Sequence, residues 1–340
     1  MHLPVVLFLT DYRGIIPQRI HEQQGLDLHI LGRELSGLGY DTAMAGYHED
    51  PLSLVDPGRP TAAIYATSQW AEYASFIRAH LSNMAAHGVT LLPSFEHALA
   101  HEDKIYQGIR LSGCKIKAPN SWAFGYLSHV ERFLRTAPMP LVWKTPRGFG
   151  SRGVRLVRTR QEALSLAKRV LAERVLRTER GLLRRVKERV RWERGIGRVL
   201  FQEFVPHCEY DWKVLTWGDV ACGLKRRNRA NDFRASGSGL FEFAEVPTDV
   251  LDFAYGAQLQ LGLPWGSFDV LVQQKGGTLW LAEYQGVHFG LTTALKAKFH
   301  YRRDDNGGWV RREGSVPVEA AMAAAVARVW PSPAGQGPAQ

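Results

Sequence analysis

The sequence is poor in cysteine and has no long apolar run. The first feature argues against a disulfide-rich or zinc-binding protein, and the second argues against a membrane-spanning one. Its three cysteines in 340 residues are odd in number, scattered and without the spacing of metal ligands. They are typical of reduced thiols and predict a cytoplasmic protein. No stretch approaches the roughly 18 apolar residues of a transmembrane helix, which predicts no membrane span. The start, Met1–Leu9, is interrupted by Pro4 and lacks a basic region and a cleavage site, so it predicts a core strand and not a signal peptide.

Two common nucleotide-binding motifs are also missing. No G-x-G-x-x-G follows the first predicted strand, so the N-terminal region carries no sequence signal for a dinucleotide. A glycine-rich stretch occurs later, but no G-K-[ST] closes it, which excludes a P-loop.

Positive charge is concentrated in one segment of the chain. The net charge is +10, and residues 158–198 hold fourteen Lys and Arg against five Glu, a net of +9. The rest is close to neutral, so a basic DNA-binding surface across the whole protein is not supported. The segment has helical apolar spacing, and it is either a solvated helical hairpin or a docking surface for an acidic macromolecule.

The pattern of apolar residues predicts a mixed α/β (α+β) protein of about two domains. Residues 1–100 predict an alternating α/β domain, with strands at Val5–Thr10, Asp41–Tyr47, Ala62–Thr67 and Val89–Leu92 and helices at Leu26–Leu38 and Trp70–His87. A second domain is expected over residues 101–310, then a C-terminal helix within 311–330 and a disordered tail at 331–340. Within these we expect a helical connector at Asn120–Pro140 and helices at Asp249–Leu261, Thr292–Tyr301 and Val318–Trp330.

Two strands near the end of the second domain carry oxygen-bearing side chains. Residues 268–273 and 278–282 are rich in β-branched and aromatic residues, and Lys275-Gly276-Gly277 joins them. Glu283 and Gln285 are two apart and so project from one face, and Asp269 on the first strand can join them there. Such hard donors suit Mg²⁺. The alternative is a solvated hairpin whose acids face water, although their neighbours are apolar.

A glycine-rich loop follows a strand that presents Lys144. The loop holds Gly148, Gly150 and Gly153, whose small size lets backbone N–H groups approach phosphate oxygens. Taken alone, the stretch could equally be a glycine-rich hairpin with a chance lysine. Basic groups also follow the strand at Val220–Leu224, where Lys225 leads into a polar loop that contains Arg234.

These motifs, in their order along residues 100–290, resemble the ATP-grasp superfamily, and within it carboxylate–amine ligases such as glutathione synthetase and the ribosomal-protein glutamate ligase. The order is a strand lysine, a glycine loop, Q-E-F-V, D-x-K-V, K-R, D-F-R and D…E-x-Q. The resemblance implies an ATP-grasp fold with an N-terminal Rossmann-like pre-ATP-grasp domain and two α+β subdomains that clamp ATP.

The resemblance also implies a role for each matching residue. Contacts to the ATP phosphates fall to Lys104, Lys144, Lys225 and the loop with Gly148, Gly150, Ser151 and Gly153. The adenine hinge matches Glu203, Phe204 and Val205, and either Glu209 or Asp211 meets the ribose. Arg234 matches the arginine that holds the acceptor carboxylate and the acyl phosphate, and Asp269, Glu283 and Gln285 match the ligands of two Mg²⁺ ions.

The chain departs from the family at three places. Gln285 stands where the family usually has Asn, which keeps the amide oxygen but adds a methylene. Residues 286–290 replace the usual proline- and glycine-containing sequence with one that includes V-H-F, and the basic segment is longer than a compact lid needs.

The expected activity is an ATP-dependent carboxylate–amine ligase that forms an amide through an acyl phosphate, with an amino acid or peptide as substrate. Two alternatives stay open: a small-molecule kinase of the same fold, and a non-catalytic protein that binds a polyanion through residues 158–198. A homo-oligomer is compatible with the sequence.

Overall fold

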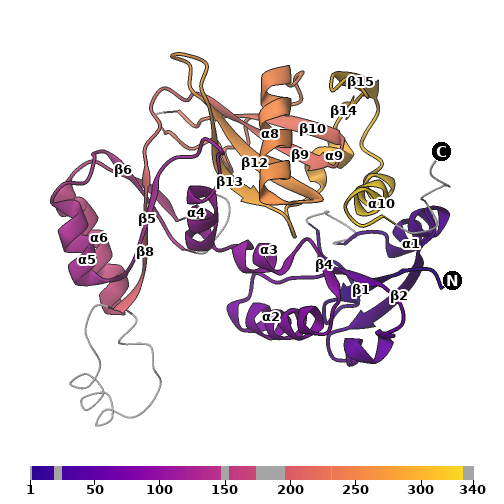
Figure 1. The fold of residues 1–340 in the computed structure, drawn as a ribbon. Coiled ribbons are helices and arrows are strands. Elements are labelled where there is room, and N and C mark those ends of the chain that lie inside the picture. Colours follow the sequence, from indigo (N-terminus) through magenta and orange to yellow (C-terminus); the bar gives the residue numbers. More distant parts are fainter. Residues whose placement is uncertain (1, 19–24, 147–152, 174–195, 231, 332–340) are drawn as a thin grey trace, which may run out of the picture. The chain divides into compact units, whose positions relative to one another are not determined.

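The computed structural model describes residues 2–18, 25–146, 153–173, 196–230 and 232–331 (Figure 1). Contacts divide the chain into two compact units. The first is discontinuous and consists of Met1–His101 and Glu209–Gln340, and the second is Glu102–Cys208.

The N-terminal part of the first unit is a parallel sheet in the strand order β2-β1-β3-β4. Its elements are β1 (Val5–Thr10), α1 (Leu28–Gly37), β2 (Asp41–Gly46), the 3-10 helix η1 (Pro51–Leu54), β3 (Thr61–Tyr65), α2 (Ala71–Ala86), β4 (Thr90–Leu92) and α3 (Phe95–Ala100). Every residue of β1 and β3 is buried, as expected for parallel strands covered on both faces. The predicted alternation of strands and helices over residues 1–100 is confirmed.

The C-terminal part of the first unit is a seven-stranded antiparallel sheet. Its order is β13-β12-β9-β10-β14-β15, and β11 also pairs with β10. The elements are β9 (Tyr210–Trp217), β10 (Val220–Arg227), β11 (Phe241–Glu242), α8 (Thr248–Leu261), β12 (Trp265–Val272), β13 (Leu279–Gln285), α9 (Thr292–Lys296), β14 (Phe299–Arg303), β15 (Trp309–Glu313) and α10 (Val318–Val329). Helix α8 packs on β9 and β12. Its C-cap is Gly262, whose φ of 65° lies in the left-handed region that glycine adopts without steric cost.

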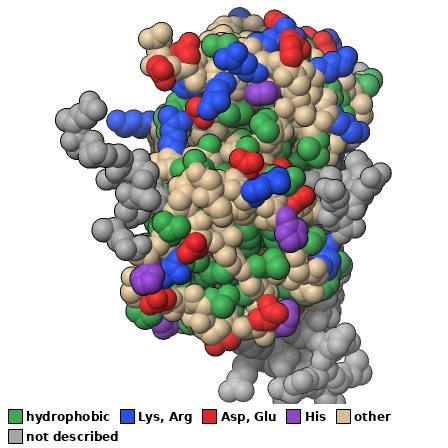
Figure 2. Space-filling view, turned by 90° about the vertical axis from the view of Figure 1, so that its right-hand side faces the viewer, with side chains coloured by type: hydrophobic (Ala, Val, Ile, Leu, Met, Phe, Trp, Pro, Cys, Tyr) green, Lys and Arg blue, Asp and Glu red, His purple; other side chains and the backbone are tan. Residues whose placement is uncertain are grey.

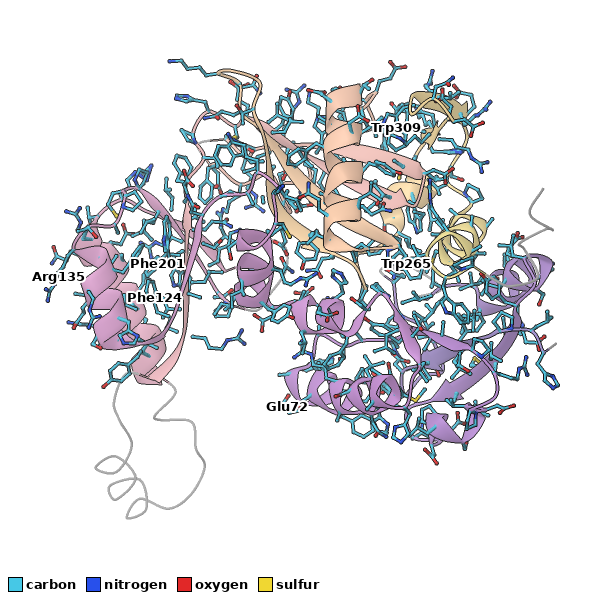
Figure 3. All side chains as sticks on the ribbon, in the orientation of Figure 1. Glu72, Phe124, Arg135, Phe201, Trp265 and Trp309 are labelled. Carbon is cyan, nitrogen blue, oxygen red and sulfur yellow. The ribbon has the colours of Figure 1, made fainter. Side chains whose placement is uncertain are left out.

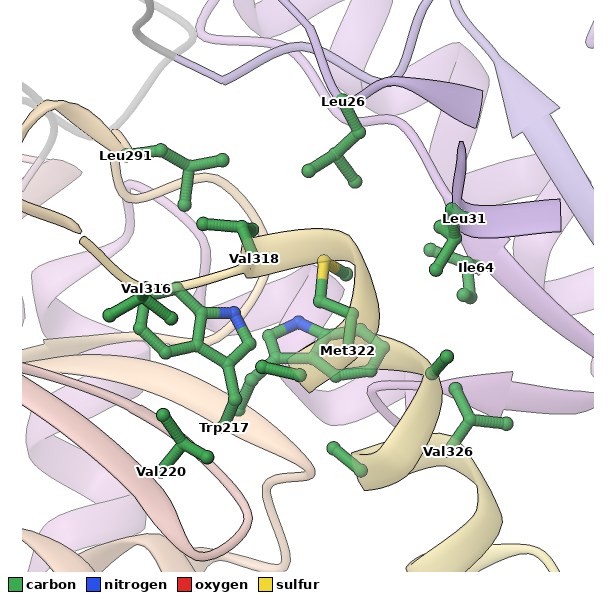
Figure 4. Close-up of a cluster of buried hydrophobic side chains, with 14 of the residues drawn as sticks. Leu26, Leu31, Ile64, Trp217, Val220, Leu291, Val316, Val318, Met322 and Val326 are labelled. Carbon is green, nitrogen blue, oxygen red and sulfur yellow. The ribbon is translucent and has the colours of Figure 1, made fainter. Parts of the chain in front are cut away.

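One hydrophobic cluster joins both parts of the first unit (Figure 4). Leu31 of α1 and Ile64 of β3 belong to it, together with Trp217 of β9 and Met322 of α10. Helix α10 packs on α1, and Tyr40 stacks on Trp330 with ring centroids 5.5 Å apart. The first hundred residues therefore share their core with the last hundred and thirty.

The second unit contains a four-stranded sheet in the order β5-β8-β6-β7. Its elements are α4 (Lys104–Ser112), β5 (Ser121–Tyr126), α5 (Leu127–Leu134), β6 (Leu141–Lys144), β7 (Val154–Val157), α6 (Arg160–Glu173) and β8 (Ile196–Glu203). Helices α5 and α6 pack on each other, and their apolar faces share a cluster with Phe201 of β8, whose side chain Figure 3 labels beside Phe124 of β5.

Three sequence-based expectations differ from the structure. Residues 120–140 contain strand β5 before helix α5, because residues 121–126 pair with β8. The helix expected at 292–301 ends at Lys296, since the next residues pair with β10 and β15 as strand β14. The predicted domain at 101–310 is divided between the units, because its strands from Tyr210 onward share a core with residues 1–100.

Over its described ranges, the structure contains no helix long and apolar enough to cross a membrane. On the face shown in Figure 2, acidic and basic side chains are interspersed and are not gathered by sign. Most of the basic segment, residues 174–195, lies outside the described residues, as does the tail from 332.

Candidate functional site

The three predicted oxygen donors lie on one face at one end of the seven-stranded sheet. Asp269 of β12 is paired directly with Glu283 of β13, and Gln285 is paired with Ser267. Directly opposed residues share a face, so the side chains of Asp269, Glu283 and Gln285 point the same way. A register shift between Asp269 and Val270 follows at once, and such irregularities often re-aim a side chain beside a site.

A buried arginine lies among these acids. Arg226 of β10 donates from Nε and Nη2 to the two carboxylate oxygens of Asp211, both at 2.7 Å, and its Nη2 lies 2.8 Å from Oδ2 of Asp269. Burial by itself lowers the pKa of Arg226, but the two carboxylates outweigh burial and raise that pKa above its ordinary value. The arginine is therefore a fixed positive charge that orients Asp269.

The donor set fits a magnesium ion. Among the described residues no three His, Cys, Asp or Glu side chains cluster as a metal site. The set here has only two carboxylates, and its third donor is the side-chain amide of Gln285. Gln285 donates from Nε2 to Oε1 of Glu283 at 3.4 Å, and no described residue donates a hydrogen bond to its buried Oε1. Two carboxylates and an amide oxygen that lacks a donor are suitable ligands for Mg²⁺, which also takes water and phosphate oxygens.

The structure places the predicted residue Lys225 away from these donors. Adjacent residues of a strand face opposite ways, and Lys225 lies on the other face, with its Nζ 4.2 Å from the ring centre of Tyr210. Two basic side chains that do lie on the site face are Arg226 and Lys213, which is paired with Asp269. Sequence reasoning missed both. The spacing in the sequence could have indicated Lys213, because it lies two residues after Asp211 and so projects from the same face of the strand. Arg226 could be found only from its pairing with Asp211.

Arg234 is held within its own loop. Its guanidinium contacts the carboxylate of Asp232, with Nη2 2.6 Å from Oδ2, and this hydrogen bond lowers the pKa of Asp232. Arg229 donates to the carbonyl of Gly237 at 2.7 Å, which closes the same loop. The side chain of Arg234 is 30% exposed and so keeps access to a ligand.

Of the two residues considered for the ribose, Glu209 is exposed and Asp211 is buried. Both oxygens of Asp211 accept from Arg226. Because Asp211 is buried and Glu209 is exposed to a ligand, the geometry favours Glu209.

The second unit brings its two predicted lysines into one region. Lys104 begins α4 and Lys144 ends β6, and both are buried. The backbone N–H of Lys104 donates to the carbonyl of Pro146 at 3.0 Å, two residues beyond Lys144. Asp103 caps α4 by accepting from Tyr106 N–H at 3.1 Å and also accepts from Arg198. Burying a lysine requires a compensating anion or hydrogen bonds, which is compatible with phosphate binding.

The described ends of the glycine loop lie against each other. Thr145 N–H donates to the carbonyl of Gly153 at 2.8 Å, and a Cβ on Gly153 would lie 1.9 Å from Oγ1 of Thr145. Only glycine fits at this position. The predicted residues Gly148, Gly150 and Ser151 lie outside the described residues.

The predicted adenine hinge follows β8. The carboxylate of Glu203 accepts from the backbone N–H and the side-chain amide of Asn120, at 3.1 and 2.8 Å. Its own N–H donates to the carbonyl of Asn120 at 2.8 Å. Val205 is buried and Phe204 is partly buried. The carboxylate of Glu203 thus fixes the start of the hinge. The contacts expected from Phe204 and Val205 are made by their backbone groups and do not depend on their side chains.

A cavity of about 470 Å³ lies elsewhere, between α1 and the parallel sheet. Phe8, Leu28 and Met44 are among the residues that line it, and none of the predicted site residues does.

Comparison with known proteins gave structural likeness only. No family model matches the sequence, and no curated protein matches it. The solved structure of the D-cycloserine synthetase DcsG aligns with a TM-score of 0.57 at 16% identity, over 96% of this chain and 99% of that one. The ATP-grasp ligase PsnB, complexed with a precursor variant, Mg and ADP, aligns with a TM-score of 0.53 at 15% identity, over 96% and 98%. The macrocyclase MdnC from Microcystis aeruginosa MRC, bound to its precursor peptide, aligns with a TM-score of 0.53 at 13% identity, over 94% and 97%.

Proposed function

Since the chain has an ATP-grasp fold resembling that of carboxylate–amine ligases, we propose that it is an ATP-dependent ligase that forms an amide bond between a carboxylate and an amine. The observation that carries the proposal is the set of three aligned oxygen donors, of which the amide oxygen of Gln285 is buried and receives no hydrogen bond from the described residues. PsnB, which has a similar fold, was solved in complex with Mg and ADP, and this supports the same ligands here.

In this proposal each part of the nucleotide has its own contacts. Lys104 and Lys144 contact the phosphates, and the backbone of Phe204 and Val205 contacts adenine. Glu209 binds the ribose, since it is exposed. Glycine at position 153 lets the phosphate-binding loop close tightly at its base.

Asp269, Glu283 and Gln285 would hold Mg²⁺, which neutralises phosphate charge during phosphoryl transfer. The reaction itself has two steps. A carboxylate oxygen of the first substrate attacks the γ-phosphorus of ATP, the bond to the β,γ-bridging oxygen breaks, and ADP leaves. An amine then attacks the acyl carbon, the carbon–oxygen bond to phosphate breaks, and the amine gives up a proton.

The chain's own side chains stabilise both steps by charge. Arg234 sits in a loop next to the strand of Arg226 and would hold the acceptor carboxylate and the acyl phosphate oxygens. Arg226 keeps Asp269 oriented through its 2.8 Å contact. Fixed donors of this kind lower the barrier because they need no reorganisation when charge develops.

Hydroxylamine allows the carboxylate to be found before the amine is known, because it captures any acyl phosphate as a hydroxamate. We would incubate the purified chain with Mg²⁺, ATP, hydroxylamine and pools of amino acids and dipeptides, and measure ADP and hydroxamate by mass spectrometry. ADP formation matched by a hydroxamate supports the ligase. A stable phosphate ester without hydroxamate would indicate a kinase instead.

The metal assignment has its own test in Glu283→Gln. This substitution keeps the size of the side chain but removes a charged donor, so hydroxamate formation should fall and require a higher Mg²⁺ concentration. Glu313→Gln, in the exposed strand β15, is the matched control and should behave as the wild type. Wild-type activity of Glu283→Gln at every Mg²⁺ concentration would reject the assignment.

A further inference from the structure

The last proposed metal ligand lies where its strand ends. Gln285 is the final residue of β13, and β13 is the outermost strand of the seven-stranded sheet as the described residues form it. In that sheet Gln285 is paired with Ser267 of β12, so strand pairing supports it from one side. The end of an outermost strand opens more easily than the middle of a sheet. A metal ligand at this position therefore needs support from outside the sheet, because a metal site requires closely fixed donors.

The segment directly after Gln285 has such a support in Gln18. The side chain of Gln18 donates from Nε2 to the carbonyl of Val287 at 3.0 Å, and its Oε1 accepts from the N–H groups of Phe289 and Gly290, both at 3.2 Å. Gln18 is 4% exposed. Buried backbone groups require partners, and a side-chain amide can serve as donor and acceptor at once. One buried side chain thus holds three backbone groups of residues 287–290.

The same segment is also tied to the strand beside Asp269. Lys213 donates from Nζ to the carbonyl of Phe289 at 2.9 Å, and Lys213 is paired with Asp269. At the start of the segment, Gly286 approaches Leu263 so closely that a Cβ would lie 2.3 Å from its Cδ2. The backbone that follows the last ligand therefore has a defined path that runs back to the strand next to the first one.

We propose that Gln18 is a positioning residue of the metal site, which by fixing residues 287–290 keeps the amide of Gln285 on the face that carries Asp269 and Glu283. This inference rests on the proposed function. Groups that orient metal ligands from behind typically contribute about 10–100-fold to metal affinity. Gln18 acts through the backbone and not on the ligand atom itself, so we expect an effect of about tenfold, at the lower end of that range.

The substitution Gln18→Met tests this role without measuring turnover. Methionine fills a similar volume, but its thioether donates no hydrogen bond and accepts only weakly. Mn²⁺ is the probe for the Mg²⁺ site, and its bound fraction in the presence of saturating ADP is read from its electron paramagnetic resonance spectrum. A sample without protein gives the Mn²⁺ held by ADP alone. The Kd for Mn²⁺ should be about tenfold higher in the full-length Gln18→Met chain than in the wild type.

Gln273→Met is the matched control. Gln273 lies in the turn between β12 and β13, at the opposite end of the hairpin from Gln285, and its Oε1 accepts from Nε1 of Trp280 at 3.3 Å. The same substitution there removes a hydrogen bond from the same hairpin but leaves residues 287–290 untouched. Its affinity for Mn²⁺ should equal that of the wild type.

A measurement on the wild type keeps the inference testable even if Gln18→Met does not fold. If the Gln18 contacts favour metal binding, metal binding must stabilise those contacts by the same factor. Hydrogen exchange followed by mass spectrometry should therefore show slower exchange in peptides that cover residues 286–291 with ADP and Mg²⁺ than with ADP alone. Peptides from the β14–β15 hairpin should exchange equally in both samples.

The outcomes separate this inference from the proposed function. Equal Mn²⁺ affinity in Gln18→Met and the wild type would overturn the inference and leave the metal assignment intact, as would exchange at residues 286–291 that Mg²⁺ does not change. An equal loss of affinity in Gln273→Met would show a general weakening of the hairpin and would overturn it as well. A wild-type chain that binds no Mn²⁺ with ADP would reject the metal assignment itself, and this inference with it.

Discussion

Replacing Arg226 by methionine should destabilise the first unit strongly. The guanidinium is 7% exposed and makes two 2.7 Å hydrogen bonds to Asp211, itself 7% exposed at its side chain, and one 2.8 Å contact to Asp269. Methionine fills much of the same volume but leaves the carboxylate of Asp211 buried without its cation. Removing one partner of a buried ion pair costs about 3–5 kcal/mol.

Calorimetry of the thermal transition measures this loss. At about 2–4 °C per kcal/mol for a unit of this size, the midpoint of Arg226→Met should fall by about 6–20 °C. Adding Asp211→Asn to the same chain should recover part of the loss, since the buried group is then neutral.

The neighbouring residue supplies the control. Arg227 pairs with Glu242 at 3.3 Å, but these side chains are 60% and 47% exposed. Exposed pairs are worth about 0–1 kcal/mol, so Arg227→Met should lower the midpoint by less than about 4 °C. If both substitutions lower the midpoint equally, the buried network does not have the role that we assign to it.

Three further outcomes follow from the structure. Lys225→Met should keep ATP turnover and lose less than about 1 kcal/mol of stability, because its ammonium lies over Tyr210 on the face opposite the acids. A collapse of ADP release would instead support the phosphate contact predicted for Lys225 from the sequence. Gly153→Ala should raise the KM for ATP, because its Cβ would clash with Thr145, and adding Thr145→Gly should reverse the effect. Burial raises the pKa of Cys222 to about 12, so the unfolded state loses that proton first as pH rises. The free energy of unfolding should therefore fall by about 1.4 kcal/mol per pH unit above about 8.5, relative to Cys222→Ala. Urea titrations at several pH values measure this free energy, and the same dependence on pH in both proteins would contradict the prediction.

Much of the fold was predictable because local patterns agree with the final structure. The alternation of apolar segments over residues 1–100 gave the parallel sheet, and the two-residue spacing of Glu283 and Gln285 placed both on one face. Asp269 could be added only conditionally, since its register with Glu283 depends on the pairing of β12 with β13. The structure supplies that register.

The misplaced features depend on contacts between distant segments. Lys225 and Arg226 are adjacent cations, and composition cannot tell which one faces the acids; the pairing of Arg226 with Asp211 decides it. A helix was expected to continue past Lys296, because good helix formers precede that position. The following segment is instead strand β14, since it pairs with β10. The discontinuous unit was missed for the same reason, because no local signal reports that α10 packs on α1.

The shared core of the first unit has a consequence for how the chain is made. Helix α1 ends at Gly37, whereas α10, which packs on it, begins only at Val318. At about 5–20 residues per second, the ribosome needs roughly 15–60 s to synthesise the chain between them. During that interval Leu31 and Leu35, which are fully buried in the finished protein, lack the helix that covers them and are available to chaperones or to aggregation.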